Sequence, residues 1–516
     1  MTIFLFAARM SLALCLCLPA LAKQSERPAS DPKQDRRRSQ PSEQQGEPRR
    51  GLIDRMTSFH TDVPDHPFNV ILVRPTPTSI GVSVLTSKSG RGFVEYGPST
   101  SDSWTKQTEE QTVTAGEPVI INLEGLTSGS NRYRWCWKPE GAADWIRTEA
   151  REFHTPRPVG EGFTFTIQAD SHLDANMEPA VYERTLANAA ADRPDFHIDL
   201  GDTFMTDKRP DFRDALPQYA AQRYYFGQLC NAAPLFMVLG NHDGESGVVG
   251  RGRDNAIASW SIEQRTRFFP PPQTGDSSVY SGRIAQRPGT EPGSLYYTFV
   301  WGDARIIVLD PFWFTTTRPR GGGGGATDTT PTDDNWARTL GRQQYDWLRS
   351  TLEANTARYT FVFIHHLVGG IGKANRGGME ASSFFEWGGK NADGSDGFAT
   401  HRGGWPMPIH DLLIKHRVAA VFHGHDHLYV RAERDGVIYQ CVPQPGNARG
   451  GTRSAEEYGY KAGTILASPG HVRVRVAPEH VTVDFIRSSI AAANDGRGEQ
   501  NGSVAHSYQI TPNTDR

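Results

Sequence analysis

The chain has 516 residues, of which 37% are hydrophobic, and its 58 acidic residues nearly balance its 55 basic residues. This length allows two to four domains with sizeable cores. The near-neutral charge, without a long run of one sign in the body of the chain, argues against a nucleic-acid scaffold and against strong attraction to a membrane surface. The composition does not specify an oligomeric state.

The first 22 residues are typical of an export signal. Arg9 precedes an apolar run from Met10 to Leu18, which ends at Pro19 and the small-residue site Ala20-Leu21-Ala22. A membrane anchor is the alternative, but the run is shorter than the roughly 20 apolar residues that a membrane span needs. We therefore expect cleavage of residues 1–22 and a periplasmic or secreted protein without a stable membrane span.

Residues 23–63 are rich in Gln, Ser, Pro and Arg and poor in apolar residues, which predicts a disordered linker. Residues 64–157 then show short β-type runs separated by turn clusters, which predicts a small β-sandwich. The expected strands are 69–73, 80–85, 93–96, 119–123 and 133–137. In the last run Tyr133, Trp135 and Trp137 occupy alternate positions, so these aromatic side chains should share one face of a strand.

From residue 163 onward strands alternate with helices, which predicts an α/β domain over residues 160–490. The expected strands are 163–169, 196–200, 235–239, 305–309, 360–364 and 419–422, with helices at 178–191 and 342–352 and a closing hairpin at 472–476 and 481–486. Three long polar or glycine-rich loops, 241–254, 318–334 and 369–404, should be disordered or form the walls of a site. Residues 491–516 are expected to be a C-terminal tail.

Asp, Asn or His follows five of these expected strands directly. The residues are Asp170 and His172, then Asp202, then Asn241, His242 and Asp243, then His365 and His366, and finally His425 and His427. Because ligands bind at the carboxyl ends of strands in α/β sheets, we expect these side chains to lie together. Mixed nitrogen and oxygen donors suit Mn, Fe, Zn or Co better than a soft metal, and the chain has no C-x-x-C site.

The spacing of these residues also has a physical reason. Residues i and i+2 of a tightly turning segment can point the same way, so Asp170 with His172, and His425 with His427, can each present two donors to one centre. Glycines at 201, 240 and 424 precede the polar residues, and we expect sharp turns there that aim the next side chain inward. Taken singly, each polar residue is better explained as a cap or a core hydrogen-bonding group. Five such strand ends together favour a metal site.

The ordered series D-x-H, G-D, G-N-H-D, H and G-H-x-H resembles the calcineurin-like metallophosphoesterase superfamily over residues 163–490. The resemblance implies a four-layer α/β/β/α sandwich. The preceding domain resembles a fibronectin type III domain, an arrangement similar to that of purple acid phosphatases. The family pattern implies that one metal binds Asp170, His172 and His427, that a second binds Asn241, His365 and His425, and that Asp202 bridges the two. It also implies that His242 assists the leaving group and that Asp243 orients His242.

Two positions depart from the purple enzymes, which have D-x-G in the first motif and a Tyr three residues beyond the Asp of G-D. Here the first motif carries His172, and Met205 occupies the tyrosine position. We therefore expect no purple colour and two divalent ions rather than an obligate ferric ion. The V-x-x-H pattern of residues 362–365 favours His365 over His366 as the ligand, and His366 could instead contact substrate or a ligand residue.

The resemblance implies an exported hydrolase that cleaves small phosphate monoesters with a hydroxide bridging two divalent ions. A phosphodiesterase with the same metal pair is the close alternative, because both reactions use the same ligands. A non-catalytic binding module is the other alternative. The complete ligand set argues against that module, since a degenerate protein would be expected to have lost at least one ligand.

Overall fold

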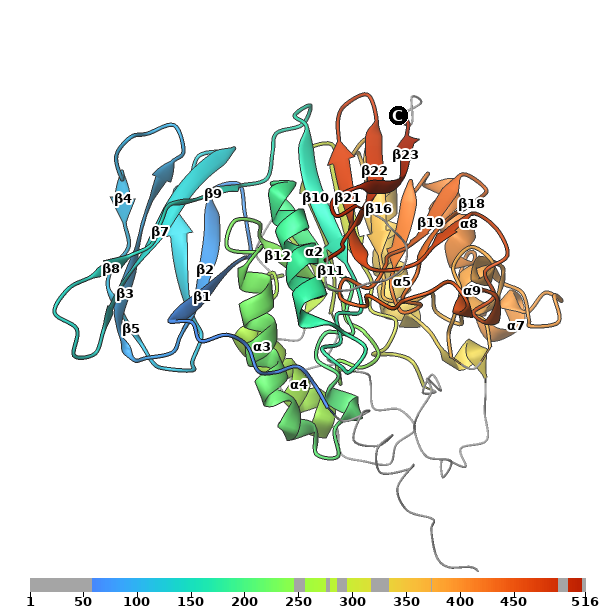
Figure 1. Cartoon of the computed structure of the whole chain (residues 1–516). Coiled ribbons are helices and arrows are strands. Elements are labelled where there is room, and N and C mark those ends of the chain that lie inside the picture. Colours follow the sequence, from blue (N-terminus) through green and yellow to red (C-terminus); the bar gives the residue numbers. More distant parts are fainter. Residues whose placement is uncertain are drawn as a thin grey trace, which may run out of the picture. The chain divides into compact units, whose positions relative to one another are not determined.

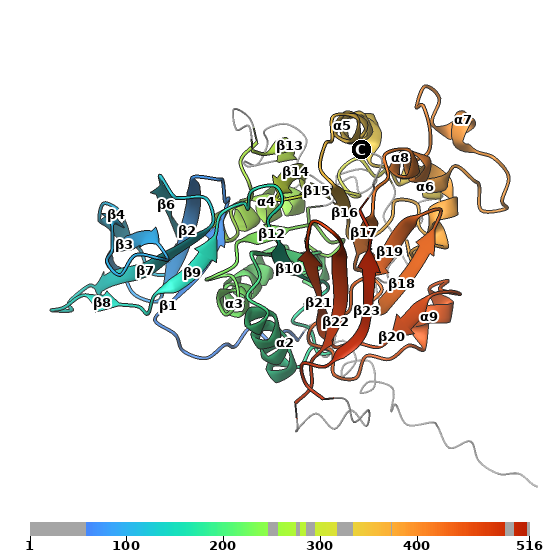
Figure 2. The ribbon, with the colours of Figure 1, turned by 90° about the horizontal axis from the view of Figure 1, so that it is seen from above.

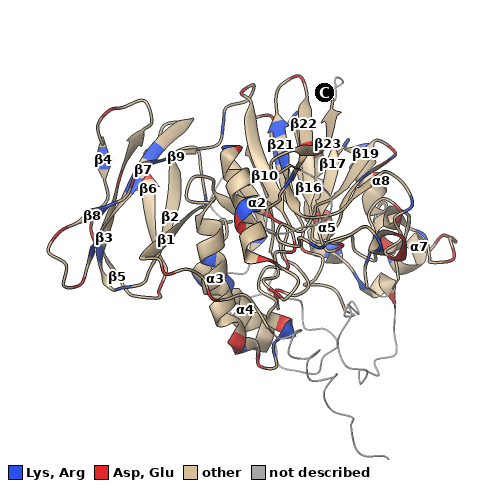
Figure 3. Ribbon diagram, in the orientation of Figure 1, with Lys and Arg blue, Asp and Glu red and all other residues tan. Residues whose placement is uncertain are grey.

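The structure is a computed structural model that describes residues 58–245, 256–274, 279–284, 295–316, 334–372, 374–490 and 500–512. The predicted signal peptide and the predicted linker up to residue 57 lie outside the described residues, as do most of the loops 241–254 and 318–334. Across the described ranges, no helix has both the length and the apolar character that a membrane crossing requires. Figure 3 shows acidic and basic residues interspersed on both domains.

The first described domain is a β-sandwich (Figure 1). One sheet has the antiparallel order β1-β2-β6, with β1 at Phe68–Val73, β2 at Ser79–Thr86 and β6 at Val119–Glu124. The other sheet is built on β3 (Gly90–Pro98) and β7 (Ser130–Pro139), which pair with the short strands β4 (Lys106–Gln107), β5 (Gln111–Val113), β8 (Ile146–Arg147) and β9 (Arg151–His154). Tyr133, Trp135 and Trp137 of β7 all lie in the sandwich core, which confirms the prediction from their alternation.

The second domain contains two mixed sheets (Figure 2). The first has the order β12-β11-β10-β21-β22-β23 and the second the order β13-β14-β15-β16-β17-β19-β18-β20. The first sheet comprises β10 (Phe163–Gln168), β11 (Phe196–Asp199), β12 (Leu235–Met237), β21 (Gly470–Val476), β22 (Val481–Arg487) and β23 (Val504–Ile510). The second comprises β13 (Ser281–Ile284), β14 (Leu295–Trp301), β15 (Ala304–Val308), β16 (Tyr359–Phe363), β17 (Ala420–His423), β18 (Tyr429–Arg434), β19 (Val437–Cys441) and β20 (Thr464–Leu466). Strands β10, β11 and β12 run parallel to one another, and so do β15, β16, β17 and β19.

Alternate side chains of these strands fill the space between the two sheets. On β10 the residues Phe163, Phe165 and Ile167 point into this core, and the Phe165 ring lies 6.2 Å from the ring of Phe363 on β16. Burial of each such side chain contributes roughly 1.5–3 kcal/mol, so the aromatic core fixes the two sheets face to face.

Helices cover the outer faces of both sheets. The α-helices are α2 (Pro179–Ala191), α3 (Leu216–Gly227), α4 (Ala256–Phe268), α5 (Gly341–Glu353), α6 (Phe385–Gly388), α7 (Phe398–His401), α8 (Ile409–Lys415) and α9 (Ser454–Glu457), with 3₁₀ turns η1 (Thr206–Lys208), η2 (Phe212–Ala215), η3 (Asn335–Ala337) and η4 (Ala381–Ser383). Helices α2 and α3 pack on the first sheet, and α5 and α8 pack on the second. The four-layer α/β/β/α arrangement that the resemblance implies is therefore confirmed.

Three segments differ from the sequence prediction. Residues 58–63, expected to belong to the disordered linker, are ordered, because Phe59 bridges Asp174 and the N–H of His60 donates to the Leu173 carbonyl oxygen. Residues 504–510 are not part of a tail, because β23 pairs antiparallel with β22 and forms the edge of the first sheet. Most of its residues are exposed or half-buried, and such an edge strand has too weak an apolar alternation to be found from the sequence. The loop 369–404, described except for residue 373, is also more regular than expected, since it contains η4, α6 and α7.

Arg223 of α3 links the sandwich to the α/β domain. Its buried guanidinium donates hydrogen bonds of 2.9 Å to Asn69 Oδ1, to Ser83 Oγ and to the Ser83 carbonyl oxygen, all on the sandwich. A fourth bond, also 2.9 Å, goes to the carbonyl oxygen of Phe268 on α4. Burial lowers the pKa of Arg223 to about 9, because these four acceptors are neutral and compensate the buried charge only in part.

Candidate metal centre

The polar residues that follow five strands come together where the carboxyl ends of the two sheets meet. Asp170, Asp202 and Asn241 follow β10, β11 and β12 of the first sheet, whereas His365 and His425 follow β16 and β17 of the second. Two groups of candidate ligands result: Asp170, His172 and His427 in the first group, and Asp202, His365 and His425 in the second. Within each group the ligand atoms lie within 4.8 Å of one another.

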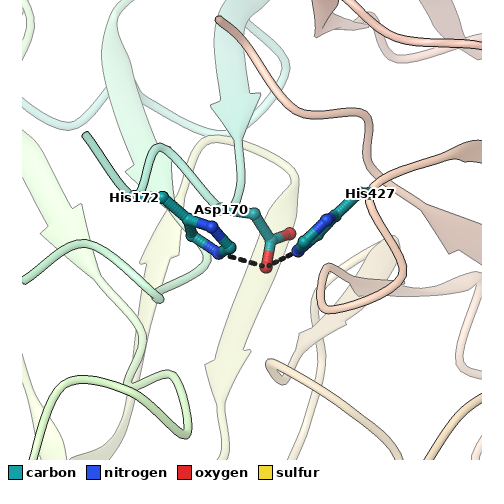
Figure 4. Close-up of side chains that lie close together, drawn as sticks. All are labelled: Asp170, His172 and His427. Atoms are coloured by element: carbon teal, nitrogen blue, oxygen red, sulfur yellow. Dashed lines mark ion pairs between the residues drawn. The ribbon is translucent and has the colours of Figure 1, made fainter. Parts of the chain in front are cut away.

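In the first group Asp170 lies between two histidines (Figure 4). Its Oδ1 is 3.8 Å from Nε2 of His172 and 3.6 Å from Nε2 of His427. Asp170 Oδ1 and His172 Nε2 are buried and have no hydrogen-bond partner among the described residues. Buried polar atoms are rarely left unpaired, so a cation between these atoms fits the site.

The orientation of His172 is set by a residue that the motif did not identify. Its Nδ1 lies 3.3 Å from Oδ2 of Asp174, and the carboxylate can only accept a hydrogen bond from the ring. Nδ1 therefore carries a proton, which leaves Nε2, beside Asp170, as the atom that can bind a metal; this is the usual arrangement behind a metal-binding histidine. The D-x-H-x-D spacing was the available signal for Asp174.

In the second group two imidazoles face each other, with His365 Nε2 and His425 Nδ1 3.2 Å apart. His365 Nδ1 donates to the Leu200 carbonyl oxygen at 2.8 Å, and His425 Nε2 donates to the Ala374 carbonyl oxygen at 2.9 Å. When both rings are neutral, the facing nitrogens carry lone pairs, which repel unless a cation lies between them. Asn241 Oδ1, 3.1 Å from His365 Nε2, adds an oxygen donor at the same point.

The Asp202 carboxylate belongs to the second group but also lies next to the first. Its Oδ2 is 3.3 Å from His365 Nε2, 3.7 Å from His172 Nε2 and 4.0 Å from Nε2 of His242. Burial by itself raises the pKa of Asp202, but His365 and His242 hold that pKa well below its ordinary value. Burial likewise lowers the pKa of His365, while the charge of Asp202 raises it to about 9. The centre therefore attracts positive charge.

The loops of the centre are conformationally unusual. The backbone φ angle is 60° at Asp170, 51° at His172, 57° at Asp202, 70° at His425 and 59° at His427. Residues other than glycine seldom adopt this left-handed conformation, and such strain clusters at functional sites. Hydrogen bonds between loops hold it in place: for example, the N–H of His425 donates to Asp170 Oδ2 at 2.9 Å.

The three glycines of the motifs have two different roles. Gly201 has a φ of 91°, so the expected sharp turn is found there. Gly240 and Gly424 are not in the left-handed region, but a turn begins at each of them: the N–H of Asp243 donates to the Gly240 carbonyl oxygen at 3.3 Å, and the N–H of Asp426 donates to the Gly424 carbonyl oxygen at 2.9 Å. A Cβ at Gly240 would overlap the backbone of Asp202, and one at Gly424 would lie 2.8 Å from Asp170 Oδ2. These two glycines are needed because another loop of the centre approaches closely.

The prediction that Asp243 orients His242 is wrong. The Asp243 carboxylate accepts hydrogen bonds of 2.7–3.1 Å from four backbone N–H groups, those of Asp202, Thr203, Phe204 and Gly240. Asp207 takes the expected place, with its Oδ1 2.8 Å from Nδ1 of His242. Sequence adjacency suggested Asp243, but its side chain turns inward to fix the Asp202 loop, whereas η1 brings Asp207 to the ring.

The structure places His365, not His366, in the second group. His366 is buried with its Nδ1 3.1 Å from the carbonyl oxygen of Leu367, and its ring packs edge-on against Phe312 at 4.9 Å. Burial holds the pKa of His366 well below its ordinary value. Phe312 is itself buried, and its ring also lies 6.0 Å from the ring of His365.

Comparison with known proteins agrees with this geometry. Residues 163–429 match the family of calcineurin-like phosphoesterases, and the chain belongs to that family. The protein is thus a phosphoric ester hydrolase, and family membership implies divalent metal ions.

Two solved structures share the fold over most of the chain. The structure of PhoD is 14% identical, with a TM-score of 0.58, and the match covers 87% of this chain and 92% of PhoD. The purple acid phosphatase PPD1 from yellow lupin (Lupinus luteus) seeds is 13% identical, with a TM-score of 0.54, and the match covers 86% of this chain and 74% of that one. At such identities the likeness shows the fold alone. A search of curated proteins found no match.

Replacing Asp174 by Asn should weaken metal binding by roughly 10- to 100-fold, because His172 loses the carboxylate that fixes its ring and tautomer. Isothermal titration of the metal-free protein with Mn²⁺ would measure this change. Asp211→Asn is the matched control: Asp211 is a half-exposed N-cap of η2, and Asn caps equally well. An Asp174→Asn protein with the affinities of the parent would contradict the role of Asp174.

Proposed function

We propose that this protein is an exported, dinuclear phosphatase that hydrolyses small phosphate monoesters. The observation that carries the proposal is the pair of adjacent ligand groups with Asp202 Oδ2 between them. In this proposal Asp170, His172 and His427 would hold one ion, Asn241, His365 and His425 would hold the other, and Asp202 would serve both. When bound, two divalent ions (Mn, Fe, Zn or Co by donor chemistry) would supply Lewis acidity to the phosphoryl group and activate a water molecule.

The chain itself supplies a proton for the leaving group. His242 is partly buried, its Nδ1 is held by Asp207, and its Nε2 is directed toward the centre, 4.0 Å from Asp202 Oδ2. To act as a general acid, His242 must carry a proton on Nε2 while Asp207 accepts the proton on Nδ1. The Nε2 proton can pass to the leaving alkoxide oxygen as the ester bond breaks, an effect typically worth about 10²–10⁴-fold in rate.

A monoester substrate is supported by the resemblance to purple acid phosphatases, with a β-sandwich before the catalytic domain in both. A structure of that class matches this chain over both domains.

Export is supported by the apolar run Met10–Leu18 and the cleavage site at Ala20-Leu21-Ala22. N-terminal sequencing of protein recovered from outside the cytoplasm should begin at Lys23. An uncleaved N-terminus in that fraction would contradict the signal-peptide assignment.

Hydrolysis of p-nitrophenyl phosphate and of bis-p-nitrophenyl phosphate tests the central proposal. We expect release from the monoester, loss of that release after chelation, and recovery on addition of Mn, Fe, Zn or Co. Asn241→Ala should lower the recovered activity, because the second group loses its oxygen donor. A preference for the diester would identify a phosphodiesterase with the same centre. A protein that binds no metal and cleaves neither compound would refute the catalytic proposal.

The pairing of Asp207 with His242 predicts a dependence on the leaving group. Asp207→Asn should lower kcat about tenfold or more for an alkyl phosphate, whose alkoxide needs protonation, but much less for p-nitrophenyl phosphate, whose leaving group departs unprotonated. His242→Ala should show the same contrast with a larger loss. Equal losses on both substrates would mean that Asp207 supports the loop rather than the proton transfer.

A further inference from the structure

The first described residues contact the loop that carries His172. We call residues 58–66, which precede β1, the N-terminal strap. Phe59 forms an antiparallel β-bridge with Asp174, and the N–H of His60 donates to the carbonyl oxygen of Leu173 at 2.7 Å. Further along, Val63 packs against the cluster formed by α2 and α3. Figure 1 shows the strap leading from this loop past α3 to the sandwich.

A second set of contacts connects Phe59 to His172 through side chains. The guanidinium of Arg209 lies 3.7 Å over the centre of the Phe59 ring, and its Nη2 donates to Gln218 Oε1 at 3.4 Å. Gln218 of α3 in turn donates from Nε2 to the carbonyl oxygen of His172 at 2.5 Å. The His172 loop is therefore held in two ways: by backbone pairing with the strap, and by the series of side-chain contacts from Phe59 through Arg209 and Gln218.

This loop needs external support. His172 and Leu173 are consecutive residues with left-handed φ angles of 51° and 55°. Neither can relax to an ordinary conformation without moving Nε2 of His172 away from Asp170 or separating Nδ1 from Asp174. Strained residues persist only where their surroundings hold them, and here the strap supplies part of that hold.

We propose that the N-terminal strap, through Phe59, is a positioning element that keeps the His172 loop in its metal-binding conformation and so sets the affinity of the first ligand group for its ion. This inference rests on the proposed metal centre. The histidines of the second group are held differently, because His365 is fixed by the Leu200 carbonyl and His425 by the Ala374 carbonyl. The strap should therefore act selectively on one of two metal-binding events.

The test is calorimetric titration of the metal-free full-length chain with Mn²⁺ alone. Phe59→Ala should weaken the affinity of one of the two binding events about tenfold and leave the other within about twofold. A tenfold loss is the lower end of the roughly 10- to 100-fold range seen when a residue that orients a metal ligand is replaced. The weakened event should be the one that Asp174→Asn also weakens. Phe59→Tyr keeps the ring under Arg209 and should restore the parent affinity. Phe68→Ala removes a half-buried ring just after the strap, on the sandwich side, and should change neither event.

The outcomes separate this inference from the metal centre itself. If Phe59→Ala binds Mn²⁺ with both parent affinities, the strap has no positioning role, while the centre stands. If the parent protein binds no ion, both the strap inference and the proposed metal centre are refuted. Equal weakening of both events would show a general structural role and would also overturn the inference. Should Phe59→Ala fail to fold by circular dichroism, Arg209→Met, which keeps the strap backbone, must show the same selective weakening, or the inference is wrong.

Discussion

The buried carboxylate of Asp202 is the interaction on which the rest of the centre depends. Its Oδ2 contacts nitrogens of both ligand groups, its Oδ1 accepts the N–H of His242 at 2.8 Å, and its own N–H donates to Asp243. A buried negative charge is costly unless cations and directed N–H groups surround it. The histidines and the backbone of the neighbouring loops provide that environment, so the same charge that orders these loops also creates a place for metal ions.

Much of the fold and nearly all of the candidate ligand set could be predicted, because the informative patterns are local. Short apolar runs in β10, β16 and β17 predict buried strands, and polar residues at their ends identify the centre. Contacts between distant loops leave no such pattern: Asp207 reaches His242 only through the position of η1, and Asp243 turns away despite being its neighbour in sequence. The short strands β4, β5 and β8 and the exposed edge strand β23 were missed because their apolar signal is too weak. The buried strands β14 and β19 were also not predicted, although their residues are mostly apolar.

In the centre, several left-handed backbone conformations occur at residues other than glycine, while two of the glycines do not have this conformation. Glycine stands at Gly240 and Gly424 because loops approach too closely for a Cβ, whereas left-handed conformations fall on aspartates and histidines that need their side chains. The sequence shows the glycines but not the strain. Functional chemistry therefore overrides the conformational preference at the positions where the two conflict.

Helix α3 serves both domains. Its Gln222 donates to Ser171 Oγ and to the Thr203 carbonyl oxygen beside the metal loops, while the adjacent Arg223 donates to Ser83 in the first sheet of the sandwich. Ile71 and Val73 of β1 belong to the same apolar cluster as α3. The sandwich is thus not a spacer that could be removed. Without it, this face of α3 would be exposed to water, and the catalytic domain would lose packing that supports the helix behind its metal loops.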